Sequence, residues 1–122
     1  MSVPVRVQLS RAKGFDLQAL SLATNGLPAQ RVSRPGPWGN PFTIAQTAAR
    51  TGLDPAAAQA QAVADYAAWV EHRLDPARSP GPPPTRQAIR AALSGKNLAC
   101  WCRPGTPCHA DILIALANGP EG

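Results

Sequence analysis

The stretch K-N-L-A-C-W-C-R-P-G-T-P-C-H-A-D-I-L at residues 96–113 decides the fold. Its first seven residues alternate between two faces of an extended chain, with Leu98, Cys100 and Cys102 on one face and Ala99 and Trp101 on the other. Apolar side chains on both faces are typical of a central strand that is covered on both sides. The stretch therefore predicts a buried strand in the middle of a sheet.

A turn and a helix are expected directly after this strand. Residues 103–105 contain a Pro-Gly pair and favour the turn. Thr106 is expected to cap the helix, and Pro107 suits its first position, where no N–H is needed. This pattern places Cys108 at the second position of the helix.

The start of this helix is the candidate functional site. Cys108, His109 and Asp111 fall in the first turn, close to Cys102 at the end of the strand. Unpaired N–H groups and the positive end of the helix dipole favour a thiolate, so we expect Cys108 to have the lowest pKa of the three thiols. Asp111 is expected to orient the imidazole of His109 or to complement the dipole.

Short strands and helices alternate in the rest of the chain. Strand patterns occur at residues 3–9 and 29–34. Helix patterns with capping residues occur at residues 43–50, 54–74 and 85–94. Residues 14–28 have an irregular pattern with an Asn-Gly turn signal, and the Pro-rich residues 75–84 are expected to form a surface loop. Helices between strands predict a single small α/β domain over residues 1–122, with helices flanking the sheet.

Composition excludes several classes of protein. The 122 residues are 44% apolar, which is too high for wholesale disorder. The apolar runs are far shorter than the ~20 residues of a membrane helix, and residues 1–6 lack the apolar core of a signal peptide. We therefore expect a cytoplasmic protein that does not span a membrane. The three Cys are an odd number, which excludes a fully paired disulfide framework within one chain.

The net charge of +5 is concentrated in the first half of the chain. Residues 1–50 contain six basic residues and one acidic residue, whereas residues 51–122 contain six of each. Most of the basic residues are Arg, which contacts phosphate and carboxylate groups with two parallel hydrogen bonds. This distribution is consistent either with an anion-binding role or with a solvated basic face.

Residues 34–42, R-P-G-P-W-G-N-P-F, form the second motif. Three Pro and two Gly within nine residues exclude a helix or a central strand. A stiff loop that presents an aromatic ring and an amide is a common way to build a binding surface.

Three interpretations of the Cys and His residues remain open from their spacing. In the first, Cys108 is a nucleophile or redox centre, with His109 as its base and Cys102 as a resolving partner. In the second, Cys100, Cys102, Cys108 and His109 are the four ligands of a zinc ion. In the third, Cys100 is a small buried hydrophobic residue, and Cys108 and His109 only cap a helix.

Helical geometry argues against the zinc interpretation. Adjacent side chains on a helix diverge by about 100°, so Cys108 and His109 would rarely both reach one ion. The sequence therefore predicts no stoichiometric zinc and implies no cofactor.

These motifs identify a family by resemblance. The loop at residues 34–42, the strand at 95–102 and the Pro-Cys-His-Ala-Asp-Ile-Leu segment at 107–113 resemble the domain of unknown function 4326 family, whose members occur in bacteria and their phages. The strand that ends in Cys before a Cys-His helix start also has a weaker likeness to the domain of unknown function 488 family, in which Arg stands in place of Ala110. The first resemblance implies that two distant segments belong to one domain, and it implies no established activity.

We expect the two motifs to face one another across a pocket. Lys13 and Arg34 would supply positive charge, Trp38 a stacking surface and Asn40 a hydrogen-bonding edge. Such a set suits an anionic, nucleotide-like small molecule, and it predicts that Trp38 lies near Cys108.

The sequence leaves two classes of function open. The first is a small protein that binds or processes a nucleotide-like ligand, with or without catalysis. The alternative is a non-catalytic module that binds nucleic acid or another protein, stabilised by zinc in one version. Gly36, Gly39 and Gly105 do not have the spacing of a phosphate-binding loop. The oligomeric state is not predicted by the sequence.

Overall fold

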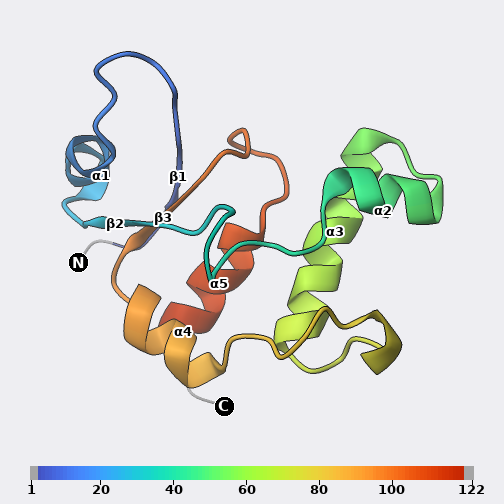
Figure 1. The fold of residues 1–122 in the computed structure, drawn as a ribbon. Helices are drawn as coiled ribbons and strands as arrows, with labels where there is room; N and C mark the ends of the chain where they lie inside the picture. Colours follow the sequence, from blue (N-terminus) through green and yellow to red (C-terminus); the bar gives the residue numbers. More distant parts are fainter. Residues whose placement is uncertain (1–2, 120–122) are drawn as a thin grey trace.

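The centre of the fold is a small parallel sheet. The computed structural model describes residues 3–119, and within them the sheet has three strands, β1 (Arg6–Gln8), β2 (Ala29–Arg31) and β3 (Asn97–Cys100). β3 lies between the other two and pairs with both in parallel, in the order β1-β3-β2 (Figure 1). The predicted central strand and the predicted α/β class are both confirmed.

Side chains cover β3 on both faces, as the sequence predicts. Leu98 and Cys100 belong to the larger core cluster, which also contains buried residues of the helices on that side of the sheet. Ala99 points to the other face, where it packs with Val7 and Leu9. All four residues of the strand are buried.

Helices and one turn of 3-10 helix complete the described part of the chain. They are α1 (Leu17–Asn25), α2 (Ile44–Thr51), α3 (Pro55–Val70), η1 (Pro76–Arg78), α4 (Arg86–Leu93) and α5 (His109–Asn118). The expected caps of α2, α3 and α4 are present, because the side chains of Thr43, Asp54 and Thr85 each accept a hydrogen bond from a backbone N–H in the first turn. None of the described helices is both long enough and apolar enough to cross a membrane.

Helix α1 corrects the prediction that residues 14–28 are irregular. Asp16 caps the helix by accepting a hydrogen bond from the backbone N–H of Ala19 at 3.0 Å. Gly26 ends it with a φ of 81°, a conformation that glycine adopts without strain. The Asn-Gly pair at residues 25–26 is thus the end of a helix rather than a turn within a loop.

Helix α3 ends at Val70, four residues before the predicted end. His72 adopts the left-handed conformation, with a φ of 60°. The N–H of Arg73 then bonds to the carbonyl of Ala68, and the N–H of His72 bonds to that of Trp69. This is the Schellman pattern of hydrogen bonds, which ends a helix by satisfying its last carbonyls.

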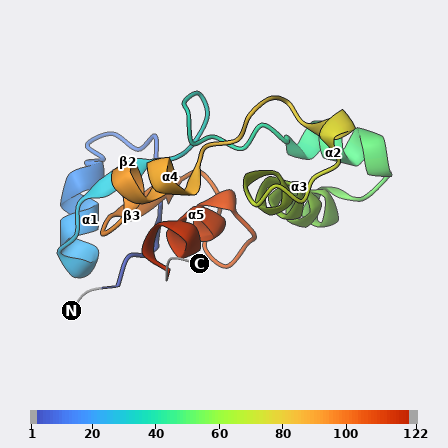
Figure 2. The ribbon, with the colours of Figure 1, turned by 90° about the horizontal axis from the view of Figure 1, so that it is seen from below.

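The helices form two groups. α1, α4 and α5 lie with the sheet, and α2 and α3 stand to one side of it as a pair (Figure 1). Figure 2 shows the same separation after a rotation of 90°, and α5 contacts α3 across it. Chain segments 32–43 and 71–85 connect the two groups.

Asn97 is a fully buried polar centre at the start of β3. Its side-chain amide donates to Ser21 Oγ and to Asn25 Oδ1, both at 2.8 Å. Its Oδ1 atom accepts from the backbone N–H of Val5 at 3.0 Å and from Asn25 Nδ2 at 2.9 Å. These bonds connect β3 to α1 and to the chain just before β1.

We expect Asn97→Ala to destabilise the protein by roughly 3 kcal/mol, because the substitution leaves several buried polar groups without partners. Urea unfolding followed by circular dichroism would measure the loss. Asn118→Ala is the matched control, since Asn118 is exposed and water can replace its hydrogen bonds. Equal losses for the two variants would contradict a central role for Asn97.

Candidate functional site: a cluster of three thiols beside a cavity

The three cysteines converge at the end of β3. Cys100 is the last residue of the strand, Cys102 lies in the turn after it, and Cys108 lies just before α5. The three Sγ atoms all lie within 4.8 Å of one another, and those of Cys100 and Cys108 are 3.1 Å apart. None of the three forms a disulfide. The turn therefore brings together a sulfur atom at the end of β3 and two sulfur atoms of the segment that connects β3 to α5.

The helix start differs from the one that the sequence predicts. Cys108 is the cap residue of α5, with extended backbone angles (φ −151°, ψ 142°), and its side chain makes no capping hydrogen bond. Thr106 does not cap the helix, because its hydroxyl donates instead to the carbonyl of Arg103 at 2.7 Å. The argument that helical geometry separates Cys108 from His109 therefore does not apply.

The cluster shifts the pKa values of Cys102 and Cys100 in opposite directions. Hydrogen bonds from the thiols of Cys100 and Cys108 stabilise the Cys102 thiolate, and with the nearby charge of Arg6 they lower the pKa of Cys102. Hydrogen bonds with Cys102 and Cys108, together with burial, raise the pKa of Cys100. The expected position of Cys108 inside the helix is wrong, and the lowered pKa belongs to Cys102 instead.

His109 is buried, and the backbone of another segment orients its ring. Its Nε2 atom lies 2.7 Å from the carbonyl oxygen of Val32, which can only accept, so Nε2 carries a proton. The ring also packs edge-on against Tyr66, with centroids 5.1 Å apart. The other nitrogen, Nδ1, faces the thiol of Cys108, whose Sγ atom lies 3.8 Å away.

Asp111 does not orient this imidazole. Its carboxylate pairs with Arg6 at 3.0 Å, and Arg6 also donates to the carbonyl of Arg103. The Val32 carbonyl orients the imidazole, which was one of the two roles that the sequence left open for Asp111.

A cavity of about 180 Å³ opens beside the thiols. It lies between the α2–α3 pair and the end of β3, and its lining includes the three cysteines and His109. Arg34 and Asn40 from the loop at residues 34–42 line the same cavity. The structure thus brings the two sequence motifs together around one space.

Two of the residues expected in this pocket lie elsewhere. Trp38 packs against the core cluster that contains Cys108, but it lines a neighbouring hollow with Arg31 rather than the cavity. Lys13 is exposed in the segment between β1 and α1 and does not line the cavity.

Sequence reasoning missed Trp101 as a wall of the cavity. The ring is 39% exposed, it lines the cavity, and the guanidinium carbon of Arg11 lies 4.6 Å from its centroid. The sequence pattern assigned Trp101 to the face opposite Cys102 because it extended the strand to residue 102. The strand ends at Cys100, so strict alternation of faces no longer holds there. The available signal was the surplus of Arg in the first half of the chain, because Arg side chains often pack over the ring of a Trp.

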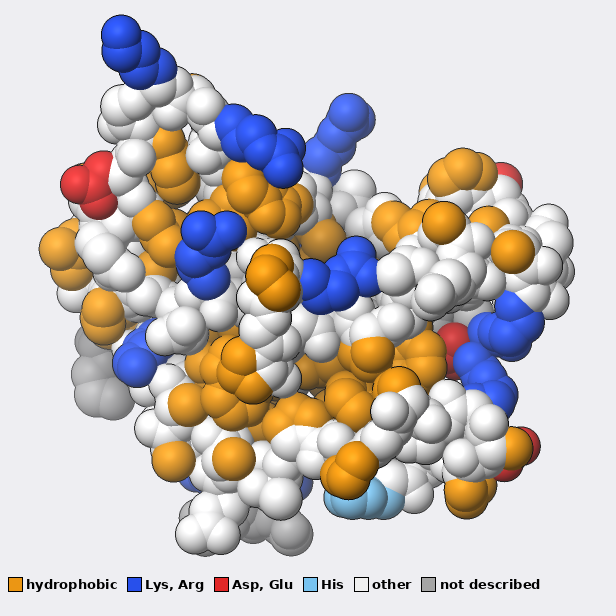
Figure 3. All heavy atoms as spheres, viewed as in Figure 1, with side chains coloured by type: hydrophobic (Ala, Val, Ile, Leu, Met, Phe, Trp, Pro, Cys, Tyr) orange, Lys and Arg blue, Asp and Glu red, His pale blue; other side chains and the backbone are white. Residues whose placement is uncertain are grey.

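Basic residues of the first half of the chain are available to a ligand. Arg11, Lys13, Arg31 and Arg34 are exposed, and none of them forms an ion pair within residues 3–119. Figure 3 shows Lys and Arg side chains gathered over the upper part of the face seen in Figure 1. The charge surplus predicted from the sequence is therefore present on the surface.

Asn40 uses its side chain to hold the loop. Its Nδ2 atom donates to the carbonyl of Ala62 in α3 at 3.2 Å, and its Oδ1 atom accepts from the N–H of Phe42 at 2.9 Å. Both polar ends of Asn40 are therefore engaged within the protein, and its contribution to the cavity is to fix the shape of the loop.

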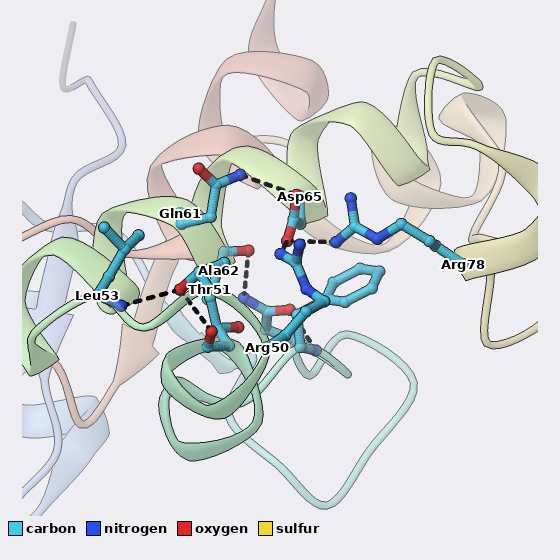
Figure 4. Close-up of polar contacts among 10 residues, drawn as sticks. Arg50, Thr51, Leu53, Gln61, Ala62, Asp65 and Arg78 are labelled. Carbon is cyan, nitrogen blue, oxygen red and sulfur yellow. Dashed lines mark hydrogen bonds and ion pairs between the residues drawn. The ribbon is translucent and has the colours of Figure 1, made fainter.

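A second polar cluster fixes α2 and η1 to α3. Arg50 and Arg78 donate to the same oxygen of Asp65 at 3.0 and 2.8 Å, and Gln61 donates to the other oxygen at 3.0 Å (Figure 4). Asp65 is buried, and its charge is compensated by the two guanidinium groups. The cluster has a structural role, because it supports the helix pair that forms one wall of the cavity.

The fold and the site define a small α/β protein with a three-thiol cluster at the end of its central strand. The chain belongs to the family described as Domain of unknown function (DUF4326), whose model matches residues 8–119. The resemblance seen in the sequence is confirmed. No curated protein and no solved structure matches the chain.

We expect iodoacetamide to modify Cys102 first in reduced, chelator-treated protein, because Cys102 is half-buried whereas Cys100 and Cys108 are each only 1% exposed. Mass spectrometry of peptides after short labelling times would identify the modified residue. Urea-unfolded protein is the control, in which all three cysteines should react at similar rates. Preferential labelling of Cys108 in the folded protein would contradict this arrangement.

Proposed function

We propose that the protein binds a small anionic, nucleotide-like ligand in the cavity at the carboxyl end of β3. The observation that carries this proposal is the lining of one cavity by a cationic side chain, Arg34, and an aromatic ring, Trp101. Ligands of parallel α/β sheets commonly bind beyond the carboxyl ends of the strands.

Arg34 is suited to contact the charged part of the ligand. It is exposed and has no ion pair within the described residues, so its guanidinium can bind phosphate or carboxylate with two parallel hydrogen bonds. Gly39 packs against its stem, since a Cβ atom added at Gly39 would lie 2.6 Å from Arg34 Cγ. The loop thus supports the first part of this side chain.

Trp101 supplies the flat surface that a nucleobase would stack on. The guanidinium of Arg11 lies over the ring, which adds positive charge at the same rim. Base stacking on an aromatic side chain contributes about 1–3 kcal/mol, so this contact would be comparable with the contact to Arg34.

The size of the cavity limits what it can enclose. Its volume of about 180 Å³ is below the roughly 300 Å³ at which pockets for drug-sized ligands begin. We infer that it takes one part of the ligand, while the rest lies along the basic surface. Lys13 and Trp38 would then contact only a ligand that extends beyond the cavity.

The cysteines form the floor of the site in which the ligand would bind. Cys102, Cys108 and His109 line the cavity, so a bound ligand would lie against them. A more specific form of this proposal is that Cys102, Cys108 and His109 also catalyse a reaction of the ligand. Asp111, which does not line the cavity, would act on them only through its ion pair with Arg6. Binding of single-stranded nucleic acid to the exposed basic residues is the alternative, which the following experiment separates.

We expect Arg34→Ala to weaken the binding of a mononucleoside diphosphate by about 10-fold or more, because a hydrogen bond to a charged group contributes about 1.5–3 kcal/mol. Titration calorimetry at low and high salt would measure this, and the difference between variant and parent should shrink at high salt. Arg73→Ala is the matched control, since it removes the same charge from an exposed Arg that pairs with Glu71.

Trp101→Ala should weaken binding at both salt concentrations, because stacking is not screened by ions. The absence of binding by any common nucleotide at millimolar concentration would overturn the proposal. Tight binding of a short oligonucleotide without binding of its mononucleotides would favour the alternative.

A further inference from the structure

The spacing of the three sulfur atoms matches a metal site. Tetrahedral zinc with Zn–S bonds of about 2.3 Å places its sulfur ligands about 3.8 Å apart. The Sγ atoms of Cys100, Cys102 and Cys108 lie within 4.8 Å of one another, and the shortest separation is 3.1 Å. The shortest separation is below the tetrahedral value and none of the others exceeds 4.8 Å, so small side-chain movements would bring all three pairs to it.

A disulfide explains the cluster less completely. The separation of 3.1 Å between Cys100 and Cys108 is well above the bond length of about 2.05 Å. A bond between these two residues would leave Cys102 and the imidazole of His109 without a role in the cluster. Coordination of one ion uses all of these groups.

The orientation of His109 is the second observation that indicates a metal. Histidines that bind metals commonly donate their other ring N–H to a backbone carbonyl or a carboxylate, which fixes the ring and directs the free nitrogen to the ion. His109 donates from Nε2 to the Val32 carbonyl, and its Nδ1 atom lies 3.8 Å from Cys108 Sγ. Tetrahedral bonds of about 2.3 and 2.05 Å place sulfur and nitrogen ligands about 3.6 Å apart.

The surroundings suit the charge of such a site. Three thiolates, one neutral imidazole and a divalent ion have a net charge of −1. Arg6, of whose side chain only 12% is exposed, lies close enough to stabilise negative charge at Cys102, and the Asp111 carboxylate that pairs with Arg6 opposes part of this effect. The N-terminus of α5 adds the positive end of a helix dipole next to Cys108.

We propose that Cys100, Cys102, Cys108 and His109 Nδ1 bind one tetrahedral divalent metal ion with an affinity for thiolates, of which Zn²⁺ is the representative. The three thiol protons leave to solvent when the ion binds, and no electron transfer is involved. This site goes beyond the proposed ligand binding, and it forms the floor of the same cavity. The ion would connect the end of β3, the turn and the start of α5.

Metal content tests the proposal directly. We expect protein that is expressed with added zinc and purified without chelator to contain about one zinc per chain by elemental mass spectrometry. Replacement by Co²⁺ should give the intense visible absorption of a tetrahedral site and a sulfur-to-cobalt charge-transfer band in the near ultraviolet. Absence of metal together with six-coordinate, weakly absorbing cobalt would overturn the site.

Alkylation of the wild-type protein provides a test that needs no variant. Bound zinc should protect Cys102 from iodoacetamide, and chelator should restore its reactivity. Equal reactivity with and without zinc would overturn the proposal. A mass two units lower in non-reduced protein, with Cys100 and Cys108 in one cross-linked peptide, would favour the disulfide instead.

Variants assign the individual ligands. Cys102→Ser and His109→Gln should each weaken zinc binding by more than about 100-fold, which is the upper end of what changes to outer-sphere partners cost. His72→Gln is the matched control for His109, since His72 is exposed and does not line the cavity beside the thiols. An unchanged cobalt spectrum in the His109 variant would remove His109 from the ligand set, and circular dichroism would show whether each variant is folded.

Separate outcomes would refute the metal site and the proposed ligand site. Arg34→Ala should leave the zinc content unchanged, because Arg34 lies outside the cluster. Zinc-loaded protein that binds no nucleotide would refute the proposed function alone. Nucleotide binding by a protein that takes up no metal would refute only the metal site.

Discussion

Hydrogen bonding along both edges of β3 is the constraint on which the rest of the structure depends. The pairing continues to the end of this short strand, where the N–H of Leu9 donates to the carbonyl of Cys100 and the N–H of Val32 donates to that of Ala99. All three strands therefore end at the same edge of the sheet. The carbonyl of Val32 is held at that edge, where His109 donates to it. A strand of four residues thereby sets the position of the imidazole as well as that of the first thiol.

The α2–α3 pair completes the site from the side, through a few polar contacts. Gln59 of α3 donates to the carbonyl of Pro107 at 2.6 Å, which connects the pair to the turn before α5. Asn40 connects the loop at residues 34–42 to the same helix. The buried Asp65 of α3 pairs with Arg50 of α2 and Arg78 of η1, and so holds these two elements against α3. The cavity lies where these connections meet, so neither group of helices forms it alone.

The two proposals use different parts of this site. A metal ion requires the thiols and His109, whereas an anionic ligand requires Arg34 and the ring of Trp101. The turn at residues 101–107 has no helix or strand of its own, and the sheet beneath it has only three short strands. A tetrahedral ion would stabilise this turn in the way that structural zinc stabilises other small domains. The floor of the cavity would then be held by a metal ion, whereas its wall would bind the ligand.

Local signals in the sequence were sufficient for the central strand, the Pro-rich loop at residues 34–42 and most of the helix caps. Each of these depends on neighbouring residues, as when Asp54 and Pro55 start a helix by satisfying or removing its free N–H groups. The same reasoning did not find α1, and it started α5 too early, because an isolated short helix is marginal and its ends depend on packing. Only the tertiary structure decided that Cys108 stays outside the helix and that Trp101 turns into the cavity. Hydrogen bonds and packing between segments far apart in the chain determine both, and these contacts leave no local pattern in the sequence.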